Sequence, residues 1–372
     1  MSKRLRQGVA QETAAYDKDA WRYRVYLSEI LCIRKDKPLQ IEMHYPIDSV
    51  LKIYYNTLAV IGVPVNLVAI LILSHGKCGL STSTTRYLVA MVMADLLFII
   101  TEVILWRITF YYFPTSFFLI TPVCSVIHAL RCATMECSVW FTVNFTFDRF
   151  VTICCQSLRA KYCTERIAAV VLATTGGLLC LKNIPHYFIQ EPGIVIDNVE
   201  WFCYVKPSYY TDPGWVLFNY FYKISTPLLP FVLILLLNAL TIRHVLVSSH
   251  IRKRLRGQNT KNNCNDREME NRRRSVILLF SISGSFILLW LVRVIEFVYY
   301  SITGANTRDY NKSEFILQRV GLMLRSLSCC TNTFIYAATQ SKFREQLKWA
   351  MLYPIKSMLR LIKKQTNWSQ RF

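Results

Sequence analysis

The stretch TRYLVAMVMADLLFIITEVILWR, residues 85–107, decides the fold class because it is apolar over nearly its whole length. About 20 consecutive apolar residues in an α-helix cover the ~30 Å hydrocarbon core of a bilayer. A window of about 19 residues finds six further stretches of this kind, at 50–74, 122–155, 166–188, 214–247, 274–301 and 314–338. The sequence therefore predicts an all-α membrane protein built as a bundle of seven transmembrane helices.

The composition of the 372-residue chain agrees with this prediction. Apolar residues make up 53% and charged residues 18%, whereas soluble proteins average about 25% charged residues. The 13 cysteines are scattered and show no paired zinc-ribbon spacing. These values exclude a disordered chain, a collagen-like repeat and a small disulfide scaffold, and they disfavour a soluble enzyme.

Lysine and arginine concentrate in alternate loops, above all in the loop after 214–247. Because cytoplasmic loops carry this excess, we expect the N-terminus outside the plasma membrane and the C-terminus inside, although the N-terminal tail is itself basic. We expect an extracellular tail at 1–49, the bundle at 50–338, and a cytoplasmic amphipathic helix with its tail at 339–372. The net charge of +21 then indicates contact with membrane lipids and not with nucleic acid.

Polar residues near mid-membrane are functional candidates, since an ionisable group in lipid is costly unless it faces the bundle interior. Asp95 lies in mid-span, and Ser138, Ser328 and Asn332 lie at comparable depth. Carboxylate, hydroxyl and amide oxygens suit a hard cation such as sodium, and we expect no other cofactor. The alternative is a hydrogen-bond network that only joins helices, and the residue pattern alone favours that network.

Charged residues in the outer halves of the spans form a second candidate set. Its members are Glu102, Arg131, Glu136, Arg293, Glu296, Arg319 and Arg325. They could form internal ion pairs, such as Arg293 with Glu296 or with Glu136. They could instead form a cationic pocket for a carboxylate-bearing ligand, because arginine binds carboxylates through two hydrogen bonds. The sequence leaves both interpretations open.

Two features mark the ends of the third span. Cys124 begins it, and a disulfide to Cys203 in the next outer loop is expected in an oxidising exterior, with Cys32 as a competing partner. The motif Asp148-Arg149-Phe150 ends the span, on the order of 37 Å further along the helix.

The seven spans, the outside N-terminus, Cys124, Asp148-Arg149-Phe150 and the tail helix together resemble a rhodopsin-like (class A) G protein-coupled receptor over roughly 50–352. The matching positions are Asn66, Asp95, Cys124, Arg149, Pro230, Phe286, Trp290, Asn332, Tyr336 and Phe343. Within the class, three passages are most similar to an orphan receptor group thought to sense aromatic amino acids and related peptides. They are Leu236-Leu237-Asn238, Leu255-Arg256-Gly257 and Leu289-Trp290 through Arg293.

The resemblance implies a receptor, not an enzyme, that binds an extracellular ligand and activates a heterotrimeric G protein. It favours the sodium-site interpretation of Asp95, Ser138, Ser328 and Asn332. We expect the G protein switch to comprise Asp148, Arg149 and Tyr336. We expect the ligand-binding residues to be Glu102, Arg131, Trp290, Arg293, Glu296 and Arg325.

The chain also departs from the family pattern. Val292 and Thr333 replace prolines of the sixth and seventh spans, Asn238 replaces a tyrosine of the fifth, and the tryptophan of the fourth is absent. These departures predict weaker activation, a different activating movement of the helices, or a gene in decay, and none of them abolishes the fold. The alternative function is a membrane transporter or channel, which predicts paired broken helices or a polar stripe through the bundle. A light receptor would need a lysine in the seventh span, and residues 315–337 contain none.

Overall fold

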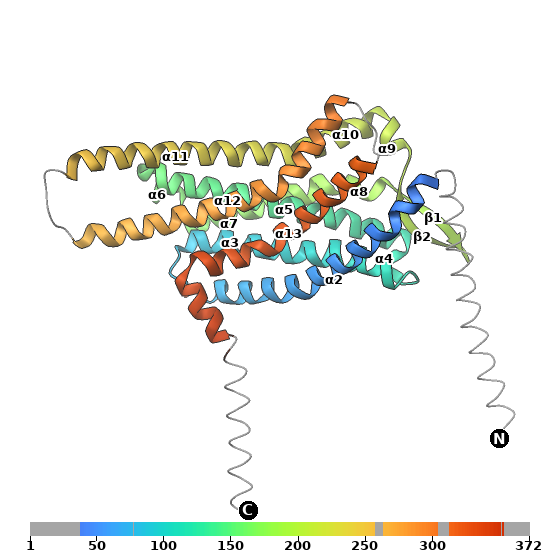
Figure 1. Ribbon diagram of the computed structural model, residues 1–372, viewed down its shortest axis with the longest axis horizontal. Helices are drawn as coiled ribbons and strands as arrows, with labels where there is room; N and C mark the ends of the chain where they lie inside the picture. Colours follow the sequence, from blue (N-terminus) through green and yellow to red (C-terminus); the bar gives the residue numbers. More distant parts are fainter. Residues whose placement is uncertain (1–37, 77, 257–262, 304–311, 351, 353–372) are drawn as a thin grey trace, which may run out of the picture. The chain divides into compact units, whose positions relative to one another are not determined.

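The computed structural model describes residues 38–76, 78–256, 263–303, 312–350 and 352 (Figure 1). The chain groups into two units, Met1–Tyr54 and Tyr55–Phe372. The described part of the first unit is helical and forms the first half of α2 (Pro38–Ser74). The second unit contains all the other named elements.

All seven predicted spans are helical. In chain order they are α2; α3 (Thr82–Phe98) with the π-helix η1 (Ile99–Ile108) and α4 (Thr109–Tyr112); α5 (Thr121–Cys154); α7 (Glu165–Asn183) with α8 (Pro185–Phe188); α10 (Pro213–Lys223) with the π-helix η3 (Ile224–Leu228) and α11 (Leu229–Arg256); α12 (Asn263–Thr303); and α13 (Lys312–Thr339). The shorter connecting helices are η2 (Phe117–Leu119), α6 (Gln156–Tyr162) and α9 (Ser208–Thr211). Residues 341–350 are also helical.

Side-chain caps fix where several helices begin. The Ser81 hydroxyl accepts from the Thr84 amide at the start of α3, and Thr164 caps α7 in the same way through Ile167. Such a cap satisfies one of the backbone N–H groups that the first helical turn leaves without a partner.

Five helical stretches of the described residues are long and apolar enough to cross a membrane. They are Ser49–Ser74, Thr82–Tyr112, Glu165–Phe188, Pro213–His250 and Arg273–Thr303. The other two predicted spans, α5 and α13, carry charged side chains such as Arg131 and Arg325 within their length, which lowers their hydropathy. The structure accounts for these charges, since both arginines are largely buried against other helices.

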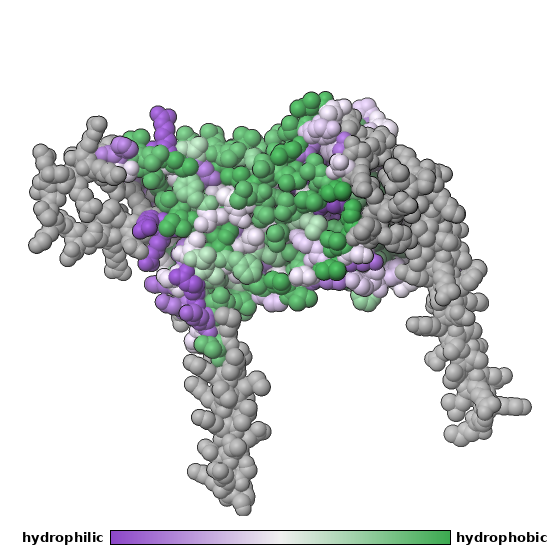
Figure 2. Space-filling model, in the orientation of Figure 1, coloured by the Kyte–Doolittle hydropathy of each residue, from purple (hydrophilic) through white to green (hydrophobic). Residues whose placement is uncertain are grey.

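Helix α5 is central in the second unit, where it contacts α3, α7, α11 and α12 (Figure 1). A continuous core joins these helices to α13 around Leu88, Phe145, Leu278 and Tyr336. On the face that Figure 2 shows, hydrophobic side chains gather along the helices. Many large apolar side chains are exposed, and Leu288, for example, is 70% exposed. This is the surface expected of helices that face lipid.

One β-hairpin covers one end of the bundle, which we call the hairpin end. It pairs β1 (Gln190–Ile196) antiparallel with β2 (Val199–Val205), with Pro192 opposite Cys203. The two loop residues, Asp197 and Asn198, have φ values of 50° and 64°, as the tight turns that match strand twist require. The predicted Cys124–Cys203 disulfide is present, with Cα atoms 6.2 Å apart, and it fixes β2 to the start of α5. The competing Cys32 lies outside the described residues.

Candidate functional site

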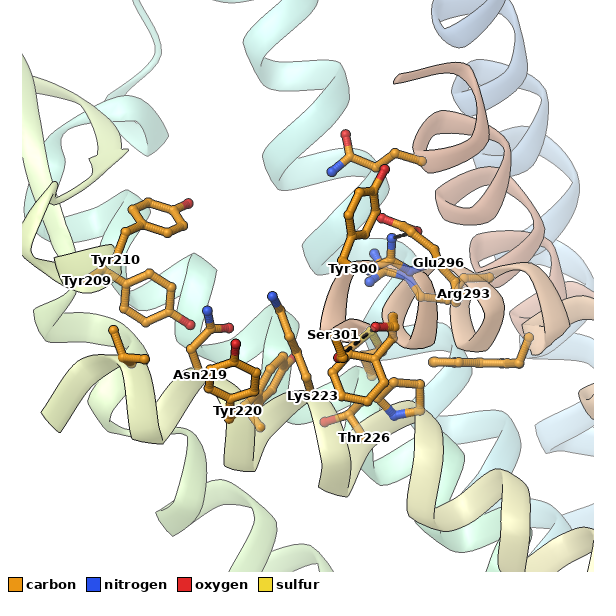
Figure 3. Close-up of a pocket in the computed structure, with 18 residues that line it drawn as sticks. Tyr209, Tyr210, Asn219, Tyr220, Lys223, Thr226, Arg293, Glu296, Tyr300 and Ser301 are labelled. Atoms are coloured by element: carbon orange, nitrogen blue, oxygen red, sulfur yellow. Dashed lines mark hydrogen bonds and ion pairs between the residues drawn. The ribbon is translucent and has the colours of Figure 1, made fainter. Parts of the chain in front are cut away.

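A cavity of about 450 Å³ lies toward the hairpin end, with walls from α5, α9, α10, η3, α12 and α13 (Figure 3). Its volume is within the range of small-molecule sites. Much of the wall is aromatic, from Tyr209, Tyr210, Tyr220, Tyr222, Trp290, Phe297 and Tyr300. Phenols and indoles offer flat apolar surface together with hydrogen-bonding groups, so the cavity suits a ligand that carries an aromatic ring.

The charges on the wall are unbalanced. Lys223, Arg293 and Arg325 are basic, and Glu296 is the one acid among the lining residues. Arg293 pairs with Glu296, three residues later on α12. Figure 3 shows Lys223 between the tyrosines of α9–α10 and this pair. Sequence reasoning missed Lys223, although a lysine inside the apolar stretch 214–247 meets the same criterion that selected the arginines.

The six predicted ligand-binding residues divide into two groups. Trp290, Arg293, Glu296 and Arg325 line the cavity, whereas Glu102 and Arg131 do not. Glu102 is fully buried, and its carboxylate faces three guanidinium groups: Arg131 at 2.9 Å, Arg107 at 3.1 Å and Arg325 at 3.8 Å. We call these four residues the Glu102 cluster. Arg325 belongs to both the cluster and the cavity wall, so it connects them.

The ion pairs resolve one alternative that the sequence left open. Both Arg131 and Arg293 have acidic partners, and the partner of Arg293 is Glu296, not Glu136. Glu136 is fully buried and accepts from Lys182 at 2.5 Å and from Asn183 at 2.6 Å. Glu136 therefore joins α5 to α7. It also accepts a hydrogen bond from the hydroxyl of Thr226 on η3.

Below the cavity, a polar centre surrounds Asp95, which has no exposed surface. The hydroxyl of Ser138 donates to one carboxylate oxygen at 2.5 Å, and the amide of Asn332 donates to the other at 2.8 Å. Ser328 does not hydrogen-bond to Asp95; its hydroxyl donates to the Arg325 carbonyl at 2.6 Å. The structure thus brings three of the four predicted sodium-site residues into direct contact.

The indole of Trp290 connects the cavity to this centre. Its ring stacks on Phe286 with centroids 5.4 Å apart, and its N–H donates to the Ser328 hydroxyl at 3.3 Å. Ser138, Ser328 and Asn332 line a void of about 10 Å³ with these rings, close to the volume one water needs. A ligand that moves Trp290 would therefore disturb the surroundings of Asp95.

At the end opposite the hairpin, Arg149 is held in place from two sides. Its guanidinium pairs with Asp148, and it also donates to the Ser275 hydroxyl of α12 at 3.4 Å. Asp148 in turn accepts from Ser83 of α3 at 2.9 Å. Tyr336, the third predicted switch residue, is buried against the ring of Phe343, with centroids 5.9 Å apart. Ser275 could not be identified from the sequence, because a single serine within a helix carries no distinctive signal.

Two of the positions that depart from the family pattern, Asn238 and Thr333, are buried inside the bundle, whereas Val292 is half-buried. Asn238 of α11 accepts from Ser283 of α12 at 3.2 Å, which joins the fifth and sixth spans. Thr333 is buried without a partner for its hydroxyl. With Val292 in place of proline, α12 is helical without interruption from Asn263 to Thr303.

The buried Asp95, the Cys124–Cys203 disulfide and the paired Arg149 indicate a seven-helix receptor. Comparison with known proteins agrees. Residues 65–336 match the 7 transmembrane receptor (rhodopsin family), and the chain belongs to this family. Over 301 residues it is 24% identical to C-C chemokine receptor type 1 of Macaca fascicularis, an alignment that covers 79% of this chain and 77% of that receptor.

Membership confirms the class A prediction and identifies the chain as a multi-pass plasma-membrane receptor that signals through heterotrimeric G proteins. Its partners are an extracellular ligand and a G protein, and the family consists of receptors, not enzymes. Neither comparison favours a transporter or channel. The similarity to the orphan group that senses aromatic amino acids stays a prediction.

Proposed function

We propose that the receptor responds to a small aromatic ligand bearing a carboxylate, such as an aromatic amino acid or a short related peptide. The observation that carries this proposal is the excess of basic side chains, three against one acid, on the wall of a largely aromatic cavity. The macaque relative is named for chemokines. A cavity of about 450 Å³ suits a small ligand, so the aromatic anion is our first hypothesis.

The ligand carboxylate would bind Lys223 and Arg325. Arg325 is the most distant of the three arginines from Glu102, at 3.8 Å, so it is the one that can turn toward the cavity at least cost. Arg107 and Arg131 would continue to neutralise Glu102. The aromatic ring would pack near Trp290, and its contacts there would favour one arrangement of α12 over another.

Activation would then require Arg149 to lose its bond to Ser275 as α12 moves. The freed guanidinium would contact the G protein, with Tyr336 contributing from α13. We assign the hairpin end to the outside and the Arg149 end to the cytoplasm, because the loops near Arg149 carry the lysine and arginine excess. Residues 341–350 would lie on the inner leaflet, where the basic side chains can contact lipid headgroups.

A sodium ion would bind at Asp95. The residues fit a hard cation, since Ser138, Ser328 and Asn332 supply oxygen atoms around a small void, and Ser138 and Asn332 also contact the Asp95 carboxylate. Binding would require the Ser138 hydroxyl to turn its lone pairs toward the ion. By neutralising Asp95, the cation would favour the inactive arrangement of the helices, in which Arg149 keeps its bond to Ser275.

The test is G protein activation in cells that express the chain, with a panel of aromatic amino acids and short peptides. We expect a response that Arg149→Ala abolishes and that Lys223→Met weakens. Lys206→Met is the matched control, a lysine near the same end that does not line the cavity. Equal potency in Lys223→Met and Lys206→Met would contradict the proposed pocket. If no ligand acts on the unmodified receptor, Val292→Pro and Thr333→Pro test whether the departures disable the switch.

A further inference from the structure

Three buried side chains near the cavity, none of which lines it, have the spacing of metal ligands. His128 and Cys132 are four residues apart on α5, so they lie on one face of the helix. His186 reaches them from α8. Their ligand atoms all lie within 4.8 Å of one another. Within the described residues, this is the group of three such side chains that comes close enough to hold an ion.

His186 supplies an independent indication of a ligand. Its side chain is only 3% exposed, and neither ring nitrogen has a hydrogen-bond partner. Buried polar groups are normally satisfied, because an unmade hydrogen bond costs the full desolvation of the group. Aromatic rings surround the imidazole, with Tyr222 at 4.6 Å and Phe218 at 5.1 Å between centroids. The Tyr222 hydroxyl interacts with the Cys132 thiol and the Phe218 ring carries no hydrogen-bonding group, so neither ring satisfies the imidazole nitrogens. A metal ion would satisfy one of them.

We propose that His128, Cys132 and His186 bind a zinc ion. Imidazole and thiolate are the ligands zinc prefers, and three protein ligands leave the fourth tetrahedral position open. Zinc–nitrogen bonds of ~2.1 Å and zinc–sulfur bonds of ~2.3 Å place tetrahedral ligand atoms roughly 3.4–3.6 Å apart. Side-chain rotations that move the ligand atoms by about 1 Å therefore suffice to form the site. Cys132 releases its thiol proton to solvent on binding. Tyr222 lies both on the cavity wall and against His186, which places the site just behind the cavity.

Zinc binding and one existing contact exclude each other. Arg131 donates to Nδ1 of His128 at 2.6 Å. If zinc binds Nδ1, that lone pair is used; if zinc binds Nε2, the neutral ring carries its proton on Nδ1 and cannot accept. Either way the hydrogen bond is lost and the cation pushes the Arg131 guanidinium away. The other charged groups near the site are Lys182 and Arg325, which oppose a cation, and Glu102 behind Arg131.

The site can be tested on the purified full-length receptor without knowing its ligand. Thermal unfolding is measured with zinc chloride, and with magnesium chloride as a hard cation that histidine and cysteine bind poorly. We expect zinc to raise the melting temperature by several degrees, and we expect Cys132→Ser and His186→Phe to lose this rise. The matched controls, His75→Phe and Cys180→Ser, should keep it. Arg131→Ala should bind zinc about tenfold more tightly, since it removes the competing donor and its charge.

Cobalt(II) offers a second measurement, whose decisive result comes from the unmodified receptor and so does not depend on how well a variant folds. Cobalt bound to a thiolate absorbs in the near ultraviolet, and we expect this band in the unmodified receptor and not in Cys132→Ser. Its absence from the unmodified receptor would overturn the proposal. A zinc-dependent rise that persists in both Cys132→Ser and His186→Phe would do the same. Unchanged zinc affinity in Arg131→Ala would overturn the competition with Arg131.

Discussion

Replacing Glu102 with glutamine should destabilise the receptor strongly. The carboxylate has no exposed surface and faces Arg131, Arg107 and Arg325, whose side chains are 17%, 17% and 12% exposed. Glutamine keeps the shape of the side chain and removes its charge. The three guanidinium groups then repel one another with no counter-ion between them.

The magnitude follows from the distances. With an effective dielectric constant of about 20, contacts at 2.9, 3.1 and 3.8 Å contribute about 6, 5 and 4 kcal/mol of Coulomb attraction. Desolvation of the four charges and repulsion among the arginines offset most of this sum. Removing one partner of a buried ion pair costs about 3–5 kcal/mol in measured cases. We expect Glu102→Gln to fall in that range.

The assay is thermal unfolding of purified receptor, together with its surface expression in cells. The control is Glu165→Gln, because Glu165 pairs with Arg86 at an exposed position, where the side chains are 48% and 56% exposed. Such pairs contribute about 0–1 kcal/mol, so this variant should unfold almost like the unmodified receptor. Arg325→Met in the Glu102→Gln background should recover part of the loss, since it removes one unpaired charge. Equal stability of Glu102→Gln and Glu165→Gln would refute the reasoning.

Three further predictions concern other contacts. Arg293→Ala should weaken ligand potency far more than surface expression, and equal loss of both would show that the pair with Glu296 is only structural. Cys203→Ser opens a loop with a sequence separation of 79, so it should lower stability by about 4 kcal/mol in unfolding measurements, whereas Cys180→Ser should not. Lys182→Met leaves Glu136 buried without a cation; its melting temperature should fall, and adding Glu136→Gln should restore part of the fall.

The sequence predicted the membrane architecture well, because hydropathy is a local property. Each of the seven apolar stretches is helical, and the helix ends follow local signals such as Ser81 and Thr164. The disulfide was also predictable, since outer cysteines in an oxidising exterior have few alternatives. The two-residue turn at Asp197 and Asn198 was not predicted, although their residue types favour positive φ.

The candidate site was only partly predictable. The arginines and glutamates were identified because a charge in an apolar span is conspicuous, and Lys223 met the same criterion but was overlooked. The sequence offered Glu296 as one partner of Arg293, three residues away on the same helix, and the structure has this pair. Ion pairs between helices could not be predicted, because the partners come from distant parts of the chain. Lys182 and Glu136 are 46 residues apart, and their contact depends on the rotation and depth of α5 and α7.

The sequence by itself determined that this chain crosses a membrane seven times and which of its residues are costly to bury. Only the tertiary structure decided that Glu102 neutralises three arginines, that Lys223 and Arg325 face one cavity, and that His128, Cys132 and His186 meet. The physical reason is that the free energy of burying an apolar helix depends on its own residues, whereas the energy of a buried charge or a metal site depends on the distance to groups that other helices supply.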